Sequence, residues 1–150
     1  MNMIKDYFWG GIGYGAESFS EIYPQYAYAG MESAAHSHSL FLQILLGVGI
    51  GGLVCFILIL VFYTQKSFEY LKEPSDKLSF MRTVSAMTAV VALTIMGIFD
   101  YVWYNNRIFF LFWVVMAIGV ACIKNGNIRK SKAENLSVYG EYSASVDIDK

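Results

Sequence analysis

The chain has 150 residues, the length of one typical domain. Hydrophobic residues make up 56% of it and charged residues only 15%, whereas soluble domains carry about 25% charged residues. The formal net charge is −1, so the chain lacks the basic surface that nucleic-acid binding requires. These values exclude a disordered, fibrous or nucleic-acid-binding protein and indicate a membrane protein.

Residues 1–39 are polar and carry a single lysine, without the apolar stretch of a signal peptide. A glycine-rich stretch runs from Phe8 to Phe19 within them. A nucleotide-binding loop is disfavoured there, because no strand precedes the glycines and no Lys-Ser or Lys-Thr follows them. The stretch favours a turn-rich surface loop, and we expect residues 1–39 to form a segment outside the membrane.

Three apolar runs follow, and each is long enough to cross a membrane with its flanks, since a spanning helix needs about 20 residues. They are Leu40–Tyr63, Val84–Phe99 with a backward extension to Leu78, and Ile108–Ile123. The sequence therefore predicts an all-α membrane protein with three transmembrane helices over residues 40–123. Residues 124–150 are polar and predict a disordered tail.

Lysine and arginine in the short loops predict the orientation, because they concentrate on the cytoplasmic side. One side carries Lys66, Lys72, Lys77 and Arg82 together with Lys124, Arg129, Lys130 and Lys132, and the other only Lys5 and Arg107. We expect a multi-pass protein of the cell membrane. Its N-terminal segment and 100–107 turn face outward, and its 64–79 loop and C-terminal tail are cytoplasmic.

Several residues at the helix ends have an ordinary structural interpretation. Asp100 and Arg107 predict an ion pair that closes the outer turn, with a role for Arg107 at an anionic ligand as the alternative. The spacing Gly47-x-x-x-Gly51 allows a close approach of another helix or subunit. Four aromatic residues are typical of a belt at the membrane interface: Tyr101, Trp103, Tyr104 and Trp113.

A short motif precedes the first apolar run: a histidine and a small polar residue, then, after two variable positions, Leu and Gln. His38, Ser39, Leu42 and Gln43 supply it here, and Gly11, Gly13, Gly15 and Phe19 form an earlier glycine stretch ending in Phe. Over residues 8–123 the chain resembles the C-terminal portion of the O-antigen ligase and polymerase superfamily of bacterial membrane glycosyltransferases. The family usually has Asn after the histidine, where this chain has Ser39.

The resemblance implies transfer of glycan from an undecaprenyl diphosphate carrier to an acceptor hydroxyl, as part of polysaccharide biosynthesis in the cell envelope. An imidazole, with an ordinary pKa near 6.5, can take the proton of that hydroxyl. We therefore expect His38 to be the catalytic base and His36, Arg107 and Gln43 to contact substrate. No metal and no other cofactor is expected. The alternative is that both histidines are solvated loop residues at a helix start.

Members of this family have about ten or more membrane helices, so we expect the chain to be the C-terminal part of a longer protein or to work with another membrane subunit. Its other partners would be undecaprenyl-diphosphate-linked glycan and membrane lipid, and not nucleic acid. The competing hypothesis is a small non-enzymatic three-helix membrane protein that binds or regulates a partner.

Overall fold

The computed structural model of the protein describes residues 2–13, 15–30 and 33–148, with only the backbone of Ala16 and of residues 139–148. No strand occurs in these described residues. The elements in chain order are α1 (Asn2–Tyr7), α2 (Ala16–Ile22), the 3₁₀ turn η1 (Tyr23–Gln25), α3 (Leu40–Lys72), α4 (Lys77–Phe99), the 3₁₀ turn η2 (Val102–Tyr104) and α5 (Asn106–Ile148).

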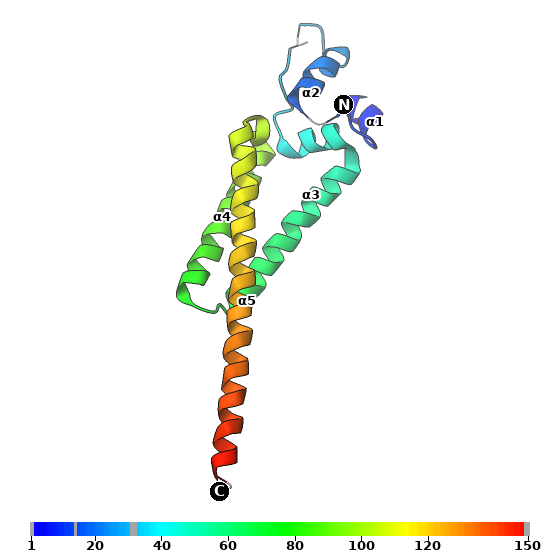
Figure 1. Cartoon of the computed structure of the whole chain (residues 1–150). Coiled ribbons are helices and arrows are strands. Elements are labelled where there is room, and N and C mark those ends of the chain that lie inside the picture. Colours follow the sequence, from blue (N-terminus) through cyan, green and yellow to red (C-terminus); the bar gives the residue numbers. More distant parts are fainter. Residues whose placement is uncertain (1, 14, 31–32, 149–150) are drawn as a thin grey trace.

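Three of the described helices, α3, α4 and α5, are long and apolar enough to span a membrane, which confirms that prediction. α3 and α5 run in one direction and α4 runs in the opposite direction (Figure 1). The elements α1, α2 and η2 therefore gather at one end of the bundle, which we call the mouth end. Residues 73–76, which join α3 to α4, lie at the opposite end.

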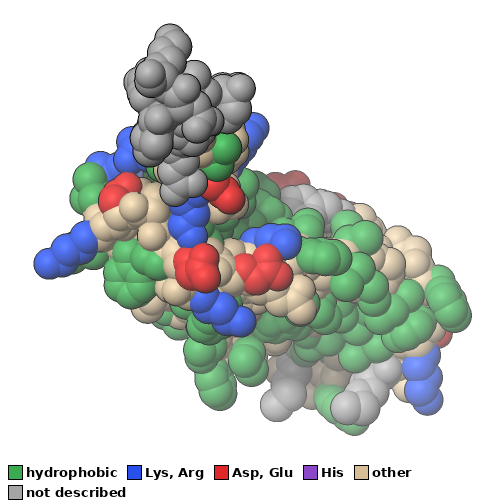
Figure 2. Space-filling view, turned by 90° about the horizontal axis from the view of Figure 1, so that it is seen from below, with side chains coloured by type: hydrophobic (Ala, Val, Ile, Leu, Met, Phe, Trp, Pro, Cys, Tyr) green, Lys and Arg blue, Asp and Glu red, His purple; other side chains and the backbone are tan. Residues whose placement is uncertain are grey.

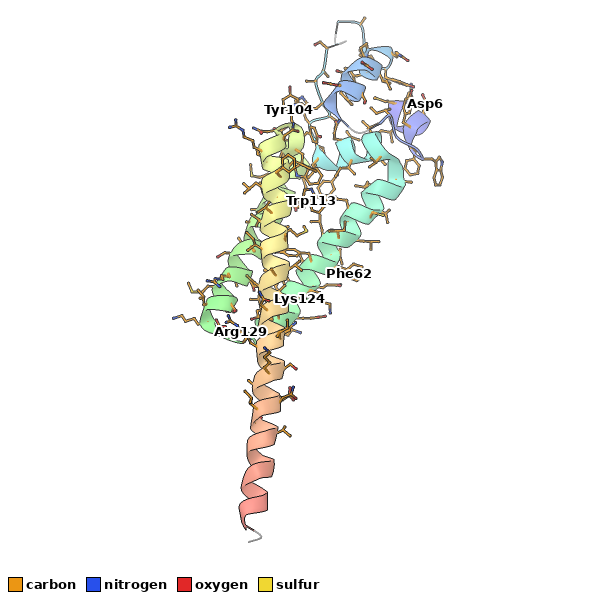
Figure 3. All side chains as sticks on the ribbon, in the orientation of Figure 1. Asp6, Phe62, Tyr104, Trp113, Lys124 and Arg129 are labelled. Atoms are coloured by element: carbon orange, nitrogen blue, oxygen red, sulfur yellow. The ribbon has the colours of Figure 1, made fainter. Side chains whose placement is uncertain are left out.

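Charged side chains gather at that opposite end, as a view along the bundle shows (Figure 2). Arg129 of α5 pairs with Asp76 at 3.1 Å, and Lys130 pairs with Glu73 at 3.5 Å. Both pairs link α5 to the α3–α4 connection, beyond the last residue of the third apolar run. Lys124 and Arg129 mark this region in Figure 3.

The structure differs here from the disordered tail predicted over residues 124–150, because α5 continues as helix to Ile148. The two ion pairs hold its first extra turns, and no proline interrupts residues 124–148. Lys, Ala, Glu and Leu in this stretch are good helix formers, so a helix that has already started can continue through polar sequence. Residues 149–150 of the predicted tail lie outside the described residues.

The parallel helices α3 and α5 pack through a repeat of seven residues, as in coiled coils. The facing pairs are Phe56 with Phe112, Tyr63 with Gly119, and Tyr70 with Gly126. A Cβ atom at either glycine would overlap the tyrosine ring that faces it. The two glycines therefore leave space for the tyrosine rings and allow α3 and α5 to pack closely.

α3 is broken at Gly49, whose backbone angles are φ 74° and ψ −176°. Residues 8–13 lie along the break and supply the hydrogen bonds that the helix has lost. Ile12 N donates to Leu46 O at 2.7 Å, Gly13 N to Gly47 O at 3.0 Å, and Ile50 N to Phe8 O at 2.8 Å. Irregular backbone at membrane depth is tolerated where protein covers it, which is what residues 8–13 provide.

At Gly47, where a close approach of another helix or subunit is predicted, the contact is made by residues 8–13 of the same chain. Gly47 and Gly49 are buried, and a Cβ at Gly49 would overlap the backbone of Trp9. Gly51 faces open space, with nothing within 4 Å of a Cβ built there. Gly49 permits the approach of residues 8–13, because a side chain there would occupy the space of that backbone.

The expected aromatic belt is only partly present. Tyr101 and Trp103 are each 5% exposed and belong to the core between the helices, whereas Tyr104 is exposed. Trp103 packs edge-to-face on Phe56, Phe109 and Phe112 at centroid distances of 5.1–5.3 Å. The η2 turn explains the difference, because it folds the chain back and directs Trp103 under the mouth end.

The N-terminal segment, expected to be a loop, contains two short helices that pack on the start of α3. Met3, Phe19 and Leu46 form the buried centre of this contact. The Tyr26 hydroxyl donates a 2.7 Å hydrogen bond to Asp6 and so ties η1 to α1. That bond to a carboxylate, which favours the protonated phenol, raises the pKa of Tyr26 to about 12.

Candidate functional site

The candidate site lies at the mouth end, where the loop of residues 33–39 enters α3. A cavity of about 690 Å³ opens there between α1, α2, this loop and the first turns of α3. Its walls are mainly apolar and include Phe19, Tyr23 and Leu42, and His36 and His38 also belong to its lining. Such a mixture of apolar walls and a few polar groups is typical of ligand sites.

Gln43 holds the loop that carries the histidines. Its side chain is 4% exposed, and its Oε1 atom accepts a 2.9 Å hydrogen bond from Ser37 N. Ser37 Oγ donates to Ser39 O at 3.1 Å, and Ser39 N donates back to Ser37 O. The geometry therefore fits a role of this glutamine in orienting the loop, because Ser37 lies between the two histidines.

His38 stands at the rim of the cavity with its side chain 83% exposed. Its Nδ1 atom lies 3.8 Å from Asp100 Oδ1, at the end of α4. The same carboxylate oxygen accepts a 2.7 Å hydrogen bond from Tyr101 N, which fixes its position. A carboxylate facing Nδ1 leaves Nε2 of the ring free to accept a proton, the arrangement found in base–carboxylate pairs.

His36 lies deeper, among aromatic rings. Its ring centroid is 4.9 Å from Tyr104, 5.7 Å from Tyr101 and 5.0 Å from His38. Its Nδ1 atom is enclosed and has no hydrogen-bond partner among the described residues. Figure 3 places Tyr104 at the mouth end, beside the start of α3.

Asp100 brings a third potential ligand beside the two histidines. One ligand atom each from His36, His38 and Asp100 lies within 4.8 Å of the other two, a grouping that could hold a metal ion. The sequence predicted no such cluster, because more than sixty positions separate the histidines from Asp100. The available signal was that the predicted topology places the start of the first helix and the end of the second on the same side.

Arg107 does not join this group. Its side chain is exposed, and its backbone N–H donates a 2.9 Å hydrogen bond to Asn105 Oδ1, which caps the start of α5. The expected Asp100–Arg107 ion pair is not formed within the described chain, where Asp100 faces His38 instead. Contact of Arg107 with substrate stays a prediction.

The motif residues and the break in α3 both lie in a part of the chain that is similar to a known family. Residues 1–57 match the O-antigen ligase family. This match confirms the resemblance, and it includes the glycine stretch, both histidines, Gln43 and the break in α3. The O-antigen ligase match ends before α4, so Asp100 and Arg107 lie outside it. No curated protein and no solved structure matches the chain at a significant level.

Proposed function

We propose that the chain forms the acceptor-activating part of a glycosyltransferase of the O-antigen ligase and polymerase type. In this proposal His38 is the general base for the acceptor hydroxyl, and undecaprenyl-diphosphate-linked glycan is the donor. The observation that carries it is the exposed His38 ring at the rim of the cavity, with Nδ1 facing the fixed carboxylate of Asp100.

The chemistry needs a base because a hydroxyl is a poor nucleophile at neutral pH. As the acceptor oxygen bonds to the anomeric carbon, its proton passes to His38 Nε2. The bond between that carbon and the diphosphate oxygen breaks, and undecaprenyl diphosphate leaves with the electron pair. Asp100 acts through His38 as a positioning residue, because its carboxylate selects the ring tautomer and stabilises the imidazolium.

The diphosphate requires cations or hydrogen-bond donors. We assign its contact to Arg107 and to His36, with Gln43 as the residue that positions the histidine loop. Arg107 lies in the first turn of α5, at the mouth end. The η2 turn lies at the same end, and its Tyr104 packs on His36. The remaining phosphate contacts would come from helices or a subunit beyond this chain.

We place the mouth end on the outer face of the cell membrane and α5 beyond Ile123 in the cytoplasm. The distribution of charge supports this, since the end opposite the mouth carries Lys72, Lys77, Arg129 and Lys130. A base at the membrane surface is also where a lipid-linked diphosphate would meet it.

The test is the rate of glycan transfer in membranes that contain the chain together with whatever helices or subunit complete it. The assay runs with EDTA and compares wild type, His38→Ala and the control Glu21→Gln, which removes an exposed carboxylate from α2 outside the cavity lining. We expect His38→Ala to lower the rate by about 10²–10⁴-fold at equal expression, since general-base catalysis contributes about that much. Wild-type transfer by His38→Ala would overturn the proposal.

A further inference from the structure

We infer that His36, His38 and Asp100 form a binding site for a divalent transition metal ion of the Zn²⁺ class. Their ligand atoms lie within 4.8 Å of one another, although the loop of residues 33–39 and the end of α4 supply them separately. Two imidazoles and a carboxylate suit zinc, and three protein ligands leave a fourth position open to water or a ligand.

The geometry needs only a small closure to bind an ion. Zinc–nitrogen and zinc–oxygen bonds of about 2.0–2.2 Å place tetrahedral ligand atoms about 3.3 Å apart. His38 Nδ1 and Asp100 Oδ1 are already 3.8 Å apart, and the exposed His38 side chain can rotate toward Asp100, whose carboxylate is held by Tyr101 N. Tyr104 and Tyr101 hold the His36 ring, so the His38 side chain can close toward two ligands that are already in place.

A second observation concerns His36 itself. Its Nδ1 atom is enclosed by protein and has no hydrogen-bond partner in the described chain, which is unusual because a buried polar atom without a partner is costly. An ion bound by His36 would give this ring a polar partner, which its Nδ1 atom lacks, and would fix its tautomer.

The site has a consequence that rests on the proposed function. A metal ion bound at His38 Nδ1 leaves the ring proton on Nε2, so Nε2 has no lone pair to take the proton of the acceptor. Zinc bound at the mouth therefore inhibits transfer, and release of the ion restores the base. On this account the three residues form an inhibitory switch that responds to divalent metal outside the membrane.

Metal binding is measured on the whole chain in nanodiscs, without reference to activity. His36 and His38 are the only histidines of the chain, so purification must use a tag without histidine. Cys55→Ser and Cys122→Ser provide a background without thiol ligands. Co²⁺ is titrated by visible absorption, and Zn²⁺ then displaces it.

We expect the Kd for Co²⁺ to rise at least tenfold in His36→Ala, His38→Ala and Asp100→Asn, and to stay unchanged in Glu21→Gln. Circular dichroism shows whether each variant keeps its helices. Absence of Co²⁺ binding, or equal Kd values in the three variants and wild type, would overturn the site.

The inhibitory role is tested separately, as the ratio of transfer rates with and without Zn²⁺ for each protein. We expect Zn²⁺ to slow wild type at least tenfold and Asp100→Asn much less, each relative to its own metal-free rate. If Zn²⁺ binds but the wild-type transfer rate is the same with and without it, the inhibitory role is wrong and the metal site stands. If His38→Ala transfers glycan at the full rate in EDTA, the proposed base fails independently of the metal.

Discussion

Replacement of Gly49 by alanine tests whether α3 is broken and covered by residues 8–13. The backbone of Gly49 has φ 74° and ψ −176°, a conformation that is essentially restricted to glycine. An alanine forced into it costs about 1–3 kcal/mol. The new methyl group would also overlap the backbone of Trp9, so residues 8–13 would have to move away.

That movement breaks hydrogen bonds that join the two segments. The bond from Ile50 N to Phe8 O, 2.8 Å long, adjoins the substitution, and the loss of one such bond costs about 0.5–1.5 kcal/mol. We therefore expect Gly49→Ala to lower the free energy of unfolding by about 2–4 kcal/mol. If α3 relaxed to a straight helix instead, Ile12 N and Gly13 N would lose their acceptors on Leu46 and Gly47.

Gly51→Ala is the matched control, because it lies in the same helix and a Cβ there meets nothing within 4 Å. Alanine is a better helix former than glycine by about 1 kcal/mol, so this variant should be as stable as wild type or more stable. The assay is unfolding in mixed micelles with increasing SDS, together with hydrogen exchange at Ile12, Gly13 and Ile50. Equal stability of the two variants, with unchanged exchange, would refute the broken helix.

Two further predictions concern the support of the site and the start of α4. Gln43→Leu removes the acceptor of the buried Ser37 N–H, which should cost about 1–3 kcal/mol of stability and speed diethyl pyrocarbonate modification of the histidines. The exposed Gln65→Leu is its control, and equal modification rates would contradict the positioning role. Hydrogen bonds from Ser79 N and Oγ hold the pKa of Asp76 below its ordinary value of 3.8. Through these bonds Asp76 caps the N-terminus of α4. Because the folded-state pKa of Asp76 is depressed, this cap stabilises α4 fully above the ordinary pKa, and the stabilisation is lost as the pH falls through the lowered pKa. The NMR shift of the Ser79 amide should therefore titrate below pH 3.8 in wild type and stay flat in Asp76→Asn; a midpoint at or above that value would contradict the cap.

Hydropathy predicted the existence of the three long helices but not their ends. A run of apolar residues marks only the part of a helix that lies in the membrane. The first run ends at Tyr63 and the third at Ile123. The helices continue through Tyr70 and Gly126, whose contact lies beyond both runs. The seven-residue spacing of Phe56, Tyr63 and Tyr70 is visible in the sequence, but its partners on α5 are not identifiable without the packing.

The break at Gly49 was harder to predict, because its glycine spacing fits a helix-packing motif equally well. The choice depends on the backbone of residues 8–13, which approaches from a distant part of the sequence. In the site, the motif predicted that His38 and Gln43 lie at a helix mouth, and the structure places them there. The sequence favours an ion pair of Asp100 with Arg107, because the two residues share a turn. The packing of α4 against α3 instead directs Asp100 to His38.

The pairing of His38 with Asp100 is the central claim, and a double-mutant cycle on the glycan transfer rate tests it most directly. The rates of wild type, His38→Ala, Asp100→Asn and the double variant are measured in EDTA at equal expression. If Asp100 acts through His38, the Asp100→Asn change lowers the wild-type rate but has no further effect once His38 is alanine. If the two losses multiply in the double variant, or if Asp100→Asn transfers glycan at the wild-type rate, the pairing plays no part in transfer.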